Sequence, residues 1–383
     1  MSLLEKHYTD EHRLFQNAVR RYFEKEVTPH VEQWEKEGIV PREAWIKFAA
    51  QGFLCPWLPE EYGGTGADFL YSFILLEEMV KTHCNGFFFG LHADIVVPYL
   101  FSFGSEEQKQ KWLPGCATGD IITAIAMTEP GAGSDLAAIR TTAVKDGDSY
   151  ILNGQKTFIS NGINCTLAIV AAKTDSQAKP AYAGISLIVV EEGTPGFEKG
   201  RRLEKPGLHS QDTVEMSFVD CRVPADNLLG QEGHGFFYLM KKLQQERIAT
   251  AMFSQVLAEE ALRLTIDFTK TREAFGKPIS RFQYISFEIA KMATEIEIGR
   301  TFIESLIIDH MEGKDVVTKA SMAKYWICEM LNRVTAQCVQ FHGGYGFMEE
   351  YPIARIFRDA RVKTIYAGTS EIMLLIISRQ LGL

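Results

Sequence analysis

Residues 236–275 read FFYLMKKLQQERIATAMFSQVLAEEALRLTIDFTKTREAF and contain neither glycine nor proline. These two residues are the strongest helix breakers, so their absence over this length predicts one long helix beginning near Phe237. At ~1.5 Å per residue, a helix crossing much of this stretch would run on the order of 40–50 Å. A helix of that length organises the part of the chain around it.

Two further helical patterns follow, over Ile285–Met311 and Val316–Val339, and a final helix is expected after Thr369. Long antiparallel helices joined by short links are typical of a four-helix bundle. Before the long helix in the sequence, the chain from Ile121 to about Leu229 has the alternation and turn residues of β-strands. We expect strands at Ile121–Met127, Leu167–Ala172 and Ile185–Val190.

Asn153-Gly154 stands between Tyr150-Ile151-Leu152 and Thr157-Phe158-Ile159, and the dipeptide Asn-Gly between apolar runs predicts a β-hairpin. Before this region the signals are helical again. Phe69–Lys81 has apolar residues at helical spacing, and Ser105 with Gln108 predicts a capping box after Gly104.

The chain therefore divides into three units: an N-terminal helical domain over residues 1–120, a middle β-barrel over 121–231, and a C-terminal four-helix bundle over 232–383. The expected fold class is α+β, with several domains.

Composition excludes some functions. The net charge is 40 − 49 = −9, which argues against a nucleic-acid partner. No apolar run approaches the ~20 residues needed to span a bilayer, so no integral membrane association is expected. Seven cysteines without a C-x-x-C pair predict reduced packing residues, and no metal site is expected. A bacterial cytoplasmic protein fits these features best, and a mature mitochondrial matrix protein fits them too.

The most specific local string is Met127-Thr128-Glu129-Pro130-Gly131-Ala132-Gly133-Ser134-Asp135. It places a glycine-rich turn after an apolar strand. Glycines let a backbone approach a ligand closely, and the amides of such a turn hold phosphate or ring oxygens. Taken alone, however, such a string is more often an ordinary loop.

This string resembles the signature of the flavin-dependent acyl-CoA dehydrogenases. Three more segments resemble motifs of the same family in the same order: Lys156–Gly162, Thr271–Ile279 with Gln283, and Gln340–Gly346. The resemblance implies the family fold, bound FAD, an acyl-CoA substrate, a homotetramer and electron-transfer flavoprotein as the electron acceptor. Phe158 would pack on the flavin ring, while Arg272 and Gln283 would reach the FAD of a neighbouring subunit.

The residues that the resemblance assigns to FAD binding are Ile125, Ala126, Met127, Thr128, Gly133, Ser134, Phe158, Ile159, Ser160, Arg272, Phe275, Gln283, Gln340, Phe341, His342, Gly343, Gly344, Thr369, Ser370 and Glu371. Those assigned to the substrate are Ser134, Gln244, Gln245, Arg247, Ala367 and Gly368. Without the resemblance, Phe158 would be interpreted as a core residue of a plain strand and Arg272 as a solvated helix end.

The C-terminal turn Ile365–Glu371 departs from the family pattern, because most members carry their catalytic glutamate where this chain has Ala367. Either the chain is inactive or its base lies elsewhere. Glu246 is similar to the base of the long-chain and isovaleryl members, which stands beside an arginine on a bundle helix. A surface glutamate is the plain alternative. Glu371 is a rival acid, but a carboxylate on the first turn of a helix suits a cap better.

The sequence thus predicts an FAD-dependent acyl-CoA dehydrogenase of fatty-acid β-oxidation, with Glu246 as catalytic base and the long-chain type favoured. A branched short-chain, isovaleryl-type enzyme is the alternative substrate class. Two other classes stay open: an oxidase that passes electrons to O₂, and a non-catalytic flavoprotein that uses the same fold as an interaction module.

Overall fold

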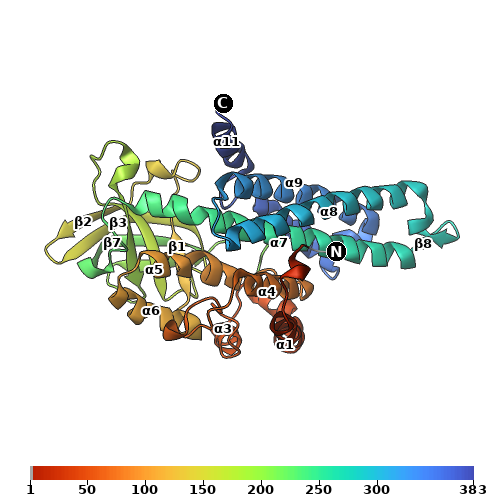
Figure 1. Cartoon of the computed structure of the whole chain (residues 1–383), viewed down its shortest axis with the longest axis horizontal. Helices are drawn as coiled ribbons and strands as arrows, with labels where there is room; N and C mark the ends of the chain where they lie inside the picture. Colours follow the sequence, from red (N-terminus) through yellow and green to blue (C-terminus); the bar gives the residue numbers. More distant parts are fainter. Residues whose placement is uncertain (1–2) are drawn as a thin grey trace.

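The computed structural model describes residues 3–383. The first part of the chain is helical (Figure 1, red to orange). Its helices are α1 (Asp10–Glu26), α2 (Val31–Glu37), α3 (Arg42–Ala49), α4 (Phe69–Lys81), a π-helical segment (Leu91–Val96), α5 (Val97–Phe103) and α6 (Glu106–Thr118). Side-chain caps fix three of these starts, one of them at Asp68, which accepts from Leu70 N–H at the start of α4. Thr9 and Ser105 each form a capping box, with His12 and Gln108 respectively. The predicted bounds of α4 and the predicted box at Ser105 are confirmed.

The middle of the chain forms one seven-stranded sheet (Figure 1, yellow). Its strands are β1 (Thr123–Ala126), β2 (Thr142–Asp146), β3 (Ser149–Ser160), β4 (Leu167–Lys173), β5 (Ile185–Glu191), β6 (Phe197–Arg202) and β7 (Thr213–Pro224). The order is β1-β4-β2-β3-β7-β6, with β5 also paired to β4. The sheet is a half-barrel around a core of its own, in which Leu152, Val170 and Phe218 are buried.

The hairpin prediction at Asn153-Gly154 is wrong. Both residues lie inside β3, which is continuous from Ser149 to Ser160 and pairs with β7 along its length. The register shifts between Leu152 and Gly154, so the dipeptide marks a β-bulge. A Cβ on Gly154 would lie 2.7 Å from the Cα of Thr141. The glycine is therefore needed for close passage of two backbones, and the reversal comes earlier, at Gly147 between β2 and β3.

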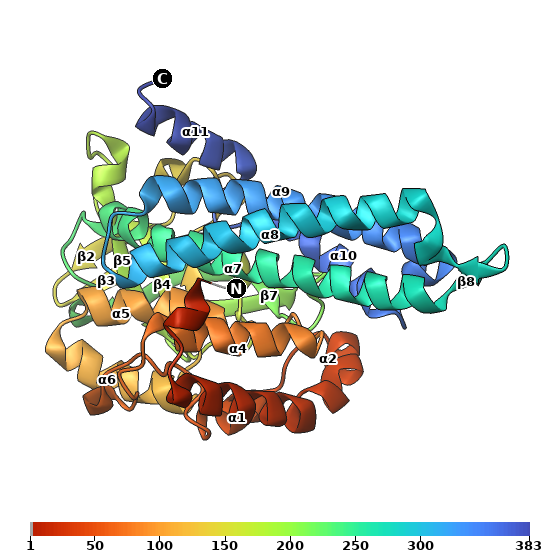
Figure 2. The ribbon, with the colours of Figure 1, turned by 45° about the vertical axis from the view of Figure 1, so that its right-hand side comes forward.

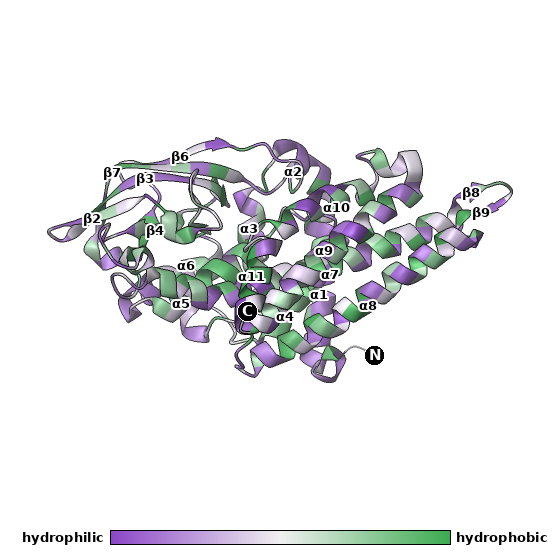
Figure 3. Cartoon of the chain, turned by 90° about the horizontal axis from the view of Figure 1, so that it is seen from above, coloured by the Kyte–Doolittle hydropathy of each residue, from purple (hydrophilic) through white to green (hydrophobic). Residues whose placement is uncertain are grey.

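The last part consists of the long helices α7 (Gly235–Thr271), α8 (Gln283–Met311) and α9 (Val317–His342), followed by α10 (Pro352–Ala360) and α11 (Ser370–Gln380). Helices α7, α8 and α9 pack along one another, and the short α10 packs on α7 and α9 (Figure 2). The predicted long helix is confirmed, since α7 has 37 residues. A two-stranded hairpin of β8 (Glu273–Ala274) and β9 (Lys277–Pro278) projects beyond the ends of α7 and α8 (Figure 3).

Helix α7 connects the three parts of the chain. It packs on α4 and α5 of the N-terminal helices, on β5 of the sheet and on the other bundle helices. One continuous apolar core joins these elements, with Phe73 of α4, Leu187 of β5 and Ile248 of α7 among its buried members. A side chain on the inner face of α7 is therefore enclosed from several sides.

The membrane and cysteine expectations can also be compared with the structure. Within residues 3–383, no helix combines the length and apolar character needed to cross a bilayer. All seven cysteines are buried and free, as predicted.

Candidate active site

Glu246 lies in the first third of α7, on the face that the other helices cover. Its side chain is buried, with 8% exposure, and its Oε2 accepts no hydrogen bond from any residue that the structure describes. Burial raises the pKa of this carboxyl to about 7, although the charges of Arg247 and Lys324 act to lower it. The interpretation as a surface glutamate is therefore wrong. A buried acid whose pKa lies near neutrality is suited to accept a proton.

Other buried polar groups near this carboxyl also lack hydrogen-bond partners among the described residues. Arg247 Nε, the Tyr99 hydroxyl and Thr250 Oγ1 have no hydrogen-bond partner among residues 3–383. The Glu246 charge acts on both Tyr99 and Arg247. Buried polar groups are normally paired, so such a cluster indicates a place where a polar ligand binds. Gln245 is different, since its Nε2 donates to the Asp94 carbonyl at 2.7 Å and fixes α7 against the π-helical segment.

The first two predicted motifs meet at the sheet. Thr157 donates its backbone N–H to Thr128 O at 2.9 Å, so the strand end and Phe158 are adjacent. Lys156 is completely buried; its Nζ donates to Met127 O at 2.9 Å and pairs with Glu129 at 2.8 Å. The sequence reasoning missed this ion pair, although both residues stood inside the quoted motifs. This ion pair and the bond to Met127 O fix the chain just after the end of β1.

Two features of the surface formed by these two motifs fit a flat ring and a phosphate-bearing ligand. Gly131 and Gly133 have open space where a Cβ would stand. Phe158 is 69% exposed and has a φ of 59°, a strained conformation for a phenylalanine. An exposed, strained aromatic residue is not a core residue, so that alternative is wrong. The π-helical segment contacts both β1 and α7, and so links this surface to the helix that carries Glu246.

The C-terminal turn is held next to the same helices. Ala367 and Gly368 have φ values of 56° and 90°. Lys324 of α9 donates to Gly368 O at 2.5 Å, and Ser370 donates to Glu329 at 2.6 Å. Glu371 lies on the first turn of α11, where its own backbone amide and Thr369 lower its pKa. This places Glu371 as a helix-terminal carboxylate and not as a base.

A cavity of about 340 Å³ adjoins this turn. Thr369, Ser370 and Glu371, all predicted to bind cofactor, line it together with Arg361 of the preceding segment. The Arg361 guanidinium can pair with phosphate oxygens, while the Ser370 hydroxyl donates to Glu329, whose carboxylate also lines the cavity.

The remaining predicted residues are far away. Arg272 ends α7, 26 positions after Glu246, so at ~1.5 Å per residue the two lie on the order of 39 Å apart along the helix. Phe275 stands on the hairpin beyond it and is 95% exposed. His342 ends α9 and stacks on Phe268 at 4.3 Å between ring centroids, near the same end of the bundle. Gly343 and Gly344 have open space around them.

One chain therefore brings together only part of the predicted set. The residues of the sheet, the start of α7 and the C-terminal turn form one group, and the third and fourth motifs form a second group at the far end of the bundle. Arg272 and Glu246 are too far apart along α7 to contact the same small molecule within one chain.

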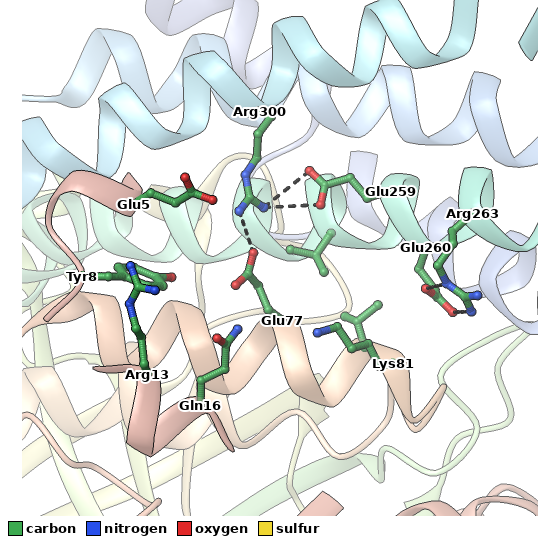
Figure 4. A pocket seen from close by; sticks show the side chains of 12 residues that line it. Glu5, Tyr8, Arg13, Gln16, Glu77, Lys81, Glu259, Glu260, Arg263 and Arg300 are labelled. Carbon is green, nitrogen blue, oxygen red and sulfur yellow. Dashed lines mark hydrogen bonds and ion pairs between the residues drawn. The ribbon is translucent and has the colours of Figure 1, made fainter. Parts of the chain in front are cut away.

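A second cavity, of about 550 Å³, lies between α1, α4, α7 and α8 (Figure 4). Five of its charged side chains are paired with one another, and Glu5, Arg13 and Lys81 line it as well. Arg300 contacts Glu77 at 2.7 Å and Glu259 at 3.3 Å, and Arg263 contacts Glu260 at 2.7 Å. The carboxylates of Glu77, Glu259 and Glu260 are thus paired with arginines, whereas Glu246 Oε2 has no hydrogen-bond partner among residues 3–383.

Comparison with known proteins agrees with this arrangement. Residues 9–120, 124–221 and 233–382 match the N-terminal, middle and C-terminal domains of acyl-CoA dehydrogenase. The long-chain specific acyl-CoA dehydrogenase of Sus scrofa mitochondria is 46% identical, over 98% of this chain and 87% of that protein. An acyl-CoA dehydrogenase of Bacillus subtilis is 39% identical, over 98% and 99%.

Solved structures give the same result. The crystal structure of acyl-CoA dehydrogenase from Geobacillus kaustophilus has a TM-score of 0.97 and 58% identity, with all of both chains covered. A glutaryl-CoA dehydrogenase from Mycobacterium smegmatis in complex with FADH2 has a TM-score of 0.90 and 30% identity, over 98% of this chain and 96% of that one. The chain belongs to the acyl-CoA dehydrogenase family, whose members are FAD-dependent enzymes.

Proposed function

We propose that this protein catalyses the α,β-dehydrogenation of a long-chain acyl-CoA thioester to the trans-2-enoyl-CoA, with Glu246 as the catalytic base. One observation carries the proposal: Glu246 is a buried carboxylate with an unpartnered oxygen, in a chain whose C-terminal turn has only the methyl group of Ala367. Of the two positions that the family uses for its base, only Glu246 carries an acid.

The reaction breaks two C–H bonds. Glu246 Oε2 takes the α-proton, and the electron pair left on the α-carbon forms the new double bond as the β-hydrogen departs with its own pair. Bound FAD supplies the acceptor for that hydride. The backbone N–H of Ala367 polarises the thioester carbonyl, which requires no side chain at that position. Arg247 and the buried Tyr99 hydroxyl order the polar end of the pocket.

The cofactor would be held by both groups of predicted residues, from two copies of the chain. The turn at Gly133–Ser134, the ring of Phe158 and the cavity beside Thr369 belong to one copy. Arg272, Phe275, Gln283 and the segment Gln340–Gly344 of a second copy complete the site. The separation of Arg272 from Glu246 and the 95% exposure of Phe275 support a site shared between copies of the chain. The homotetramer is what the family resemblance implies.

Several finer assignments belong to the same proposal. The long-chain type is favoured because relatives at 46% identity are named long-chain specific enzymes. An isovaleryl-type branched substrate is the second candidate, because those members share the base position on the bundle helix. Electron-transfer flavoprotein is the proposed acceptor, the bacterial cytoplasm the proposed compartment, and 1–120, 121–231 and 232–383 the proposed domain limits.

The test is anaerobic bleaching of the bound flavin by a panel of acyl-CoAs from isovaleryl to palmitoyl. We expect the fastest bleaching with the long chains. Fastest bleaching by isovaleryl-CoA would transfer the assignment to the branched class. Hydrogen peroxide produced stoichiometrically in air would indicate an oxidase, and a protein that no acyl-CoA bleaches would indicate a non-catalytic flavoprotein.

A further inference from the structure

Lys324 is a buried lysine in the first third of α9, and no sequence motif points to it. Its side chain is 0% exposed, and burial lowers its pKa. Keeping an ammonium group inside a protein is costly unless nearby groups compensate the charge. Its presence therefore calls for an explanation in terms of its surroundings.

The first of these surroundings is the C-terminal turn. Lys324 Nζ donates to Gly368 O at 2.5 Å. Ala367, the preceding residue, has a φ of 56°, a left-handed conformation that is unfavourable for a residue with a Cβ. A turn that contains such a residue persists only when outside contacts hold it. The bond from Lys324 is such a contact, and it joins α9 to the backbone beside the Ala367 amide.

The second group near Lys324 is the proposed base, Glu246. The Lys324 charge lowers the pKa of Glu246, and Glu246 in turn raises that of Lys324. The groups that face Glu246 are Arg247 on α7, Lys324 on α9, Tyr99 on α5 and Tyr366 before the turn. The groups that face Lys324 are Glu246 and Arg247 on α7, Cys328 and Glu329 on α9, and Glu371 on α11.

Lys324 therefore has a hydrogen bond to the proposed oxyanion-binding turn and an electrostatic interaction with the proposed base. We infer that Lys324 is a positioning residue of the dehydrogenation: its bond to Gly368 O fixes the turn that presents the Ala367 amide, and its charge acts on the carboxylate of Glu246. This inference rests on the proposed function of Glu246.

The experiment compares Lys324→Met, which removes bond and charge, with Lys324→Gln, which keeps a donor without the charge, and Lys324→Arg, which keeps the charge. Lys319→Met is the matched control, because Lys319 lies on the same helix, is partly exposed and pairs with Asp309 at 2.5 Å, away from the turn. FAD content and melting temperature are measured first. The readout is the pH profile of anaerobic flavin bleaching by palmitoyl-CoA.

In the Met and Gln variants we expect the acid limb of the profile to move up by about one pH unit, since a cation facing a buried carboxylate lowers its pKa by ~1–3 units. The Arg variant and the Lys319→Met control should keep the limb of the unmodified enzyme. If the Met variant does not fold, the Gln variant supplies the same comparison.

A second readout isolates the turn. The β-carbon of a 3-oxoacyl-CoA is a carbonyl carbon and carries no hydrogen, so this compound is not dehydrogenated. Its binding, measured by calorimetry, reports the thioester pocket without turnover. We expect binding to weaken on the order of tenfold, about 1.4 kcal/mol, in the Met variant and less in the Gln variant, because only the Met variant loses the donor to Gly368 O.

The proposed function and the positioning role of Lys324 can be refuted separately. An unmodified enzyme that no acyl-CoA bleaches would overturn the proposed function and this inference with it. A bleached enzyme whose acid limb and 3-oxoacyl-CoA affinity are the same in all Lys324 variants would overturn the inference alone, and Glu246 would remain the base.

Discussion

The pH dependence of flavin bleaching follows directly from the burial of Glu246. A base must be deprotonated before it can act, and the pKa of this carboxyl is raised to about 7. With that value, ~9% of the enzyme carries the active carboxylate at pH 6 and ~91% at pH 8. The second-order rate constant for bleaching should therefore rise about tenfold between these two pH values and level off above pH 8. An unburied glutamate would give no such limb in this range.

The assay is stopped-flow flavin absorbance under anaerobic conditions, at low acyl-CoA concentration, in buffers of constant ionic strength from pH 5.5 to 9. Two controls separate Glu246 from other acids. Glu371→Gln should leave the limb in place, because Glu371 is a helix-terminal carboxylate whose pKa is lowered. An acyl-pantetheine thioester, which has no phosphate group, should show the same limb as the acyl-CoA.

A rate constant that is flat from pH 5.5 to 9 would refute the reasoning, as would a limb that disappears in Glu371→Gln. Saturating substrate provides a further check. A bound acyl chain removes more water from the pocket, so the limb of the maximal rate should lie at or above the limb seen at low substrate.

Three other changes test the supporting structure. Lys156→Met leaves Glu129 buried without its cation, so we expect ~3–5 kcal/mol of destabilisation in denaturant unfolding and weaker FAD retention on gel filtration; unchanged values in both would show that the pair does not support the site. Phe158→Ala removes an exposed ring, so its free energy of unfolding should change by no more than ~0.5 kcal/mol while FAD affinity falls; equal FAD affinity would remove Phe158 from the site. Burial lowers the pKa of Lys363 to about 7, so the folded state binds fewer protons than the unfolded state above that pH, and stability rises with pH. Lys363→Met should therefore be more stabilising at pH 6 than at pH 9, by about 3 kcal/mol; an equal effect at both pH values would contradict a buried, titrating amine.

Much of the fold could be predicted from local signals. The absence of helix breakers over residues 236–275 predicted α7, and the capping residues at Ser105 and Gln108 predicted the start of α6. The error at Asn153-Gly154 has a simple cause. The same glycine that allows a tight turn also allows close passage of a neighbouring strand, and only the position of Thr141 distinguishes the two.

Site residues could be predicted where the residue type itself indicates the chemistry. They could not be predicted where the role depends on burial by segments that are distant in the sequence. Glu246 could be proposed because the acid expected at Ala367 is missing. Lys324 and Lys363 could not be found in this way. A lysine in a helical pattern is usually solvated, and its burial becomes visible only when chain segments about forty residues apart, such as α9 and Gly368, are placed together.

The most direct test of the account is the bleaching rate of Glu246→Gln loaded with FAD and mixed anaerobically with palmitoyl-CoA. The amide fills the same volume and cannot take the α-proton. We therefore predict a flavin content equal to that of the unmodified enzyme and a bleaching rate lower by at least ~10³-fold, within the range of general-base catalysis. A Glu246→Gln enzyme that bleaches at a rate within a few-fold of the original would show that the proton goes elsewhere, and would contradict the assignment of Glu246 as the base.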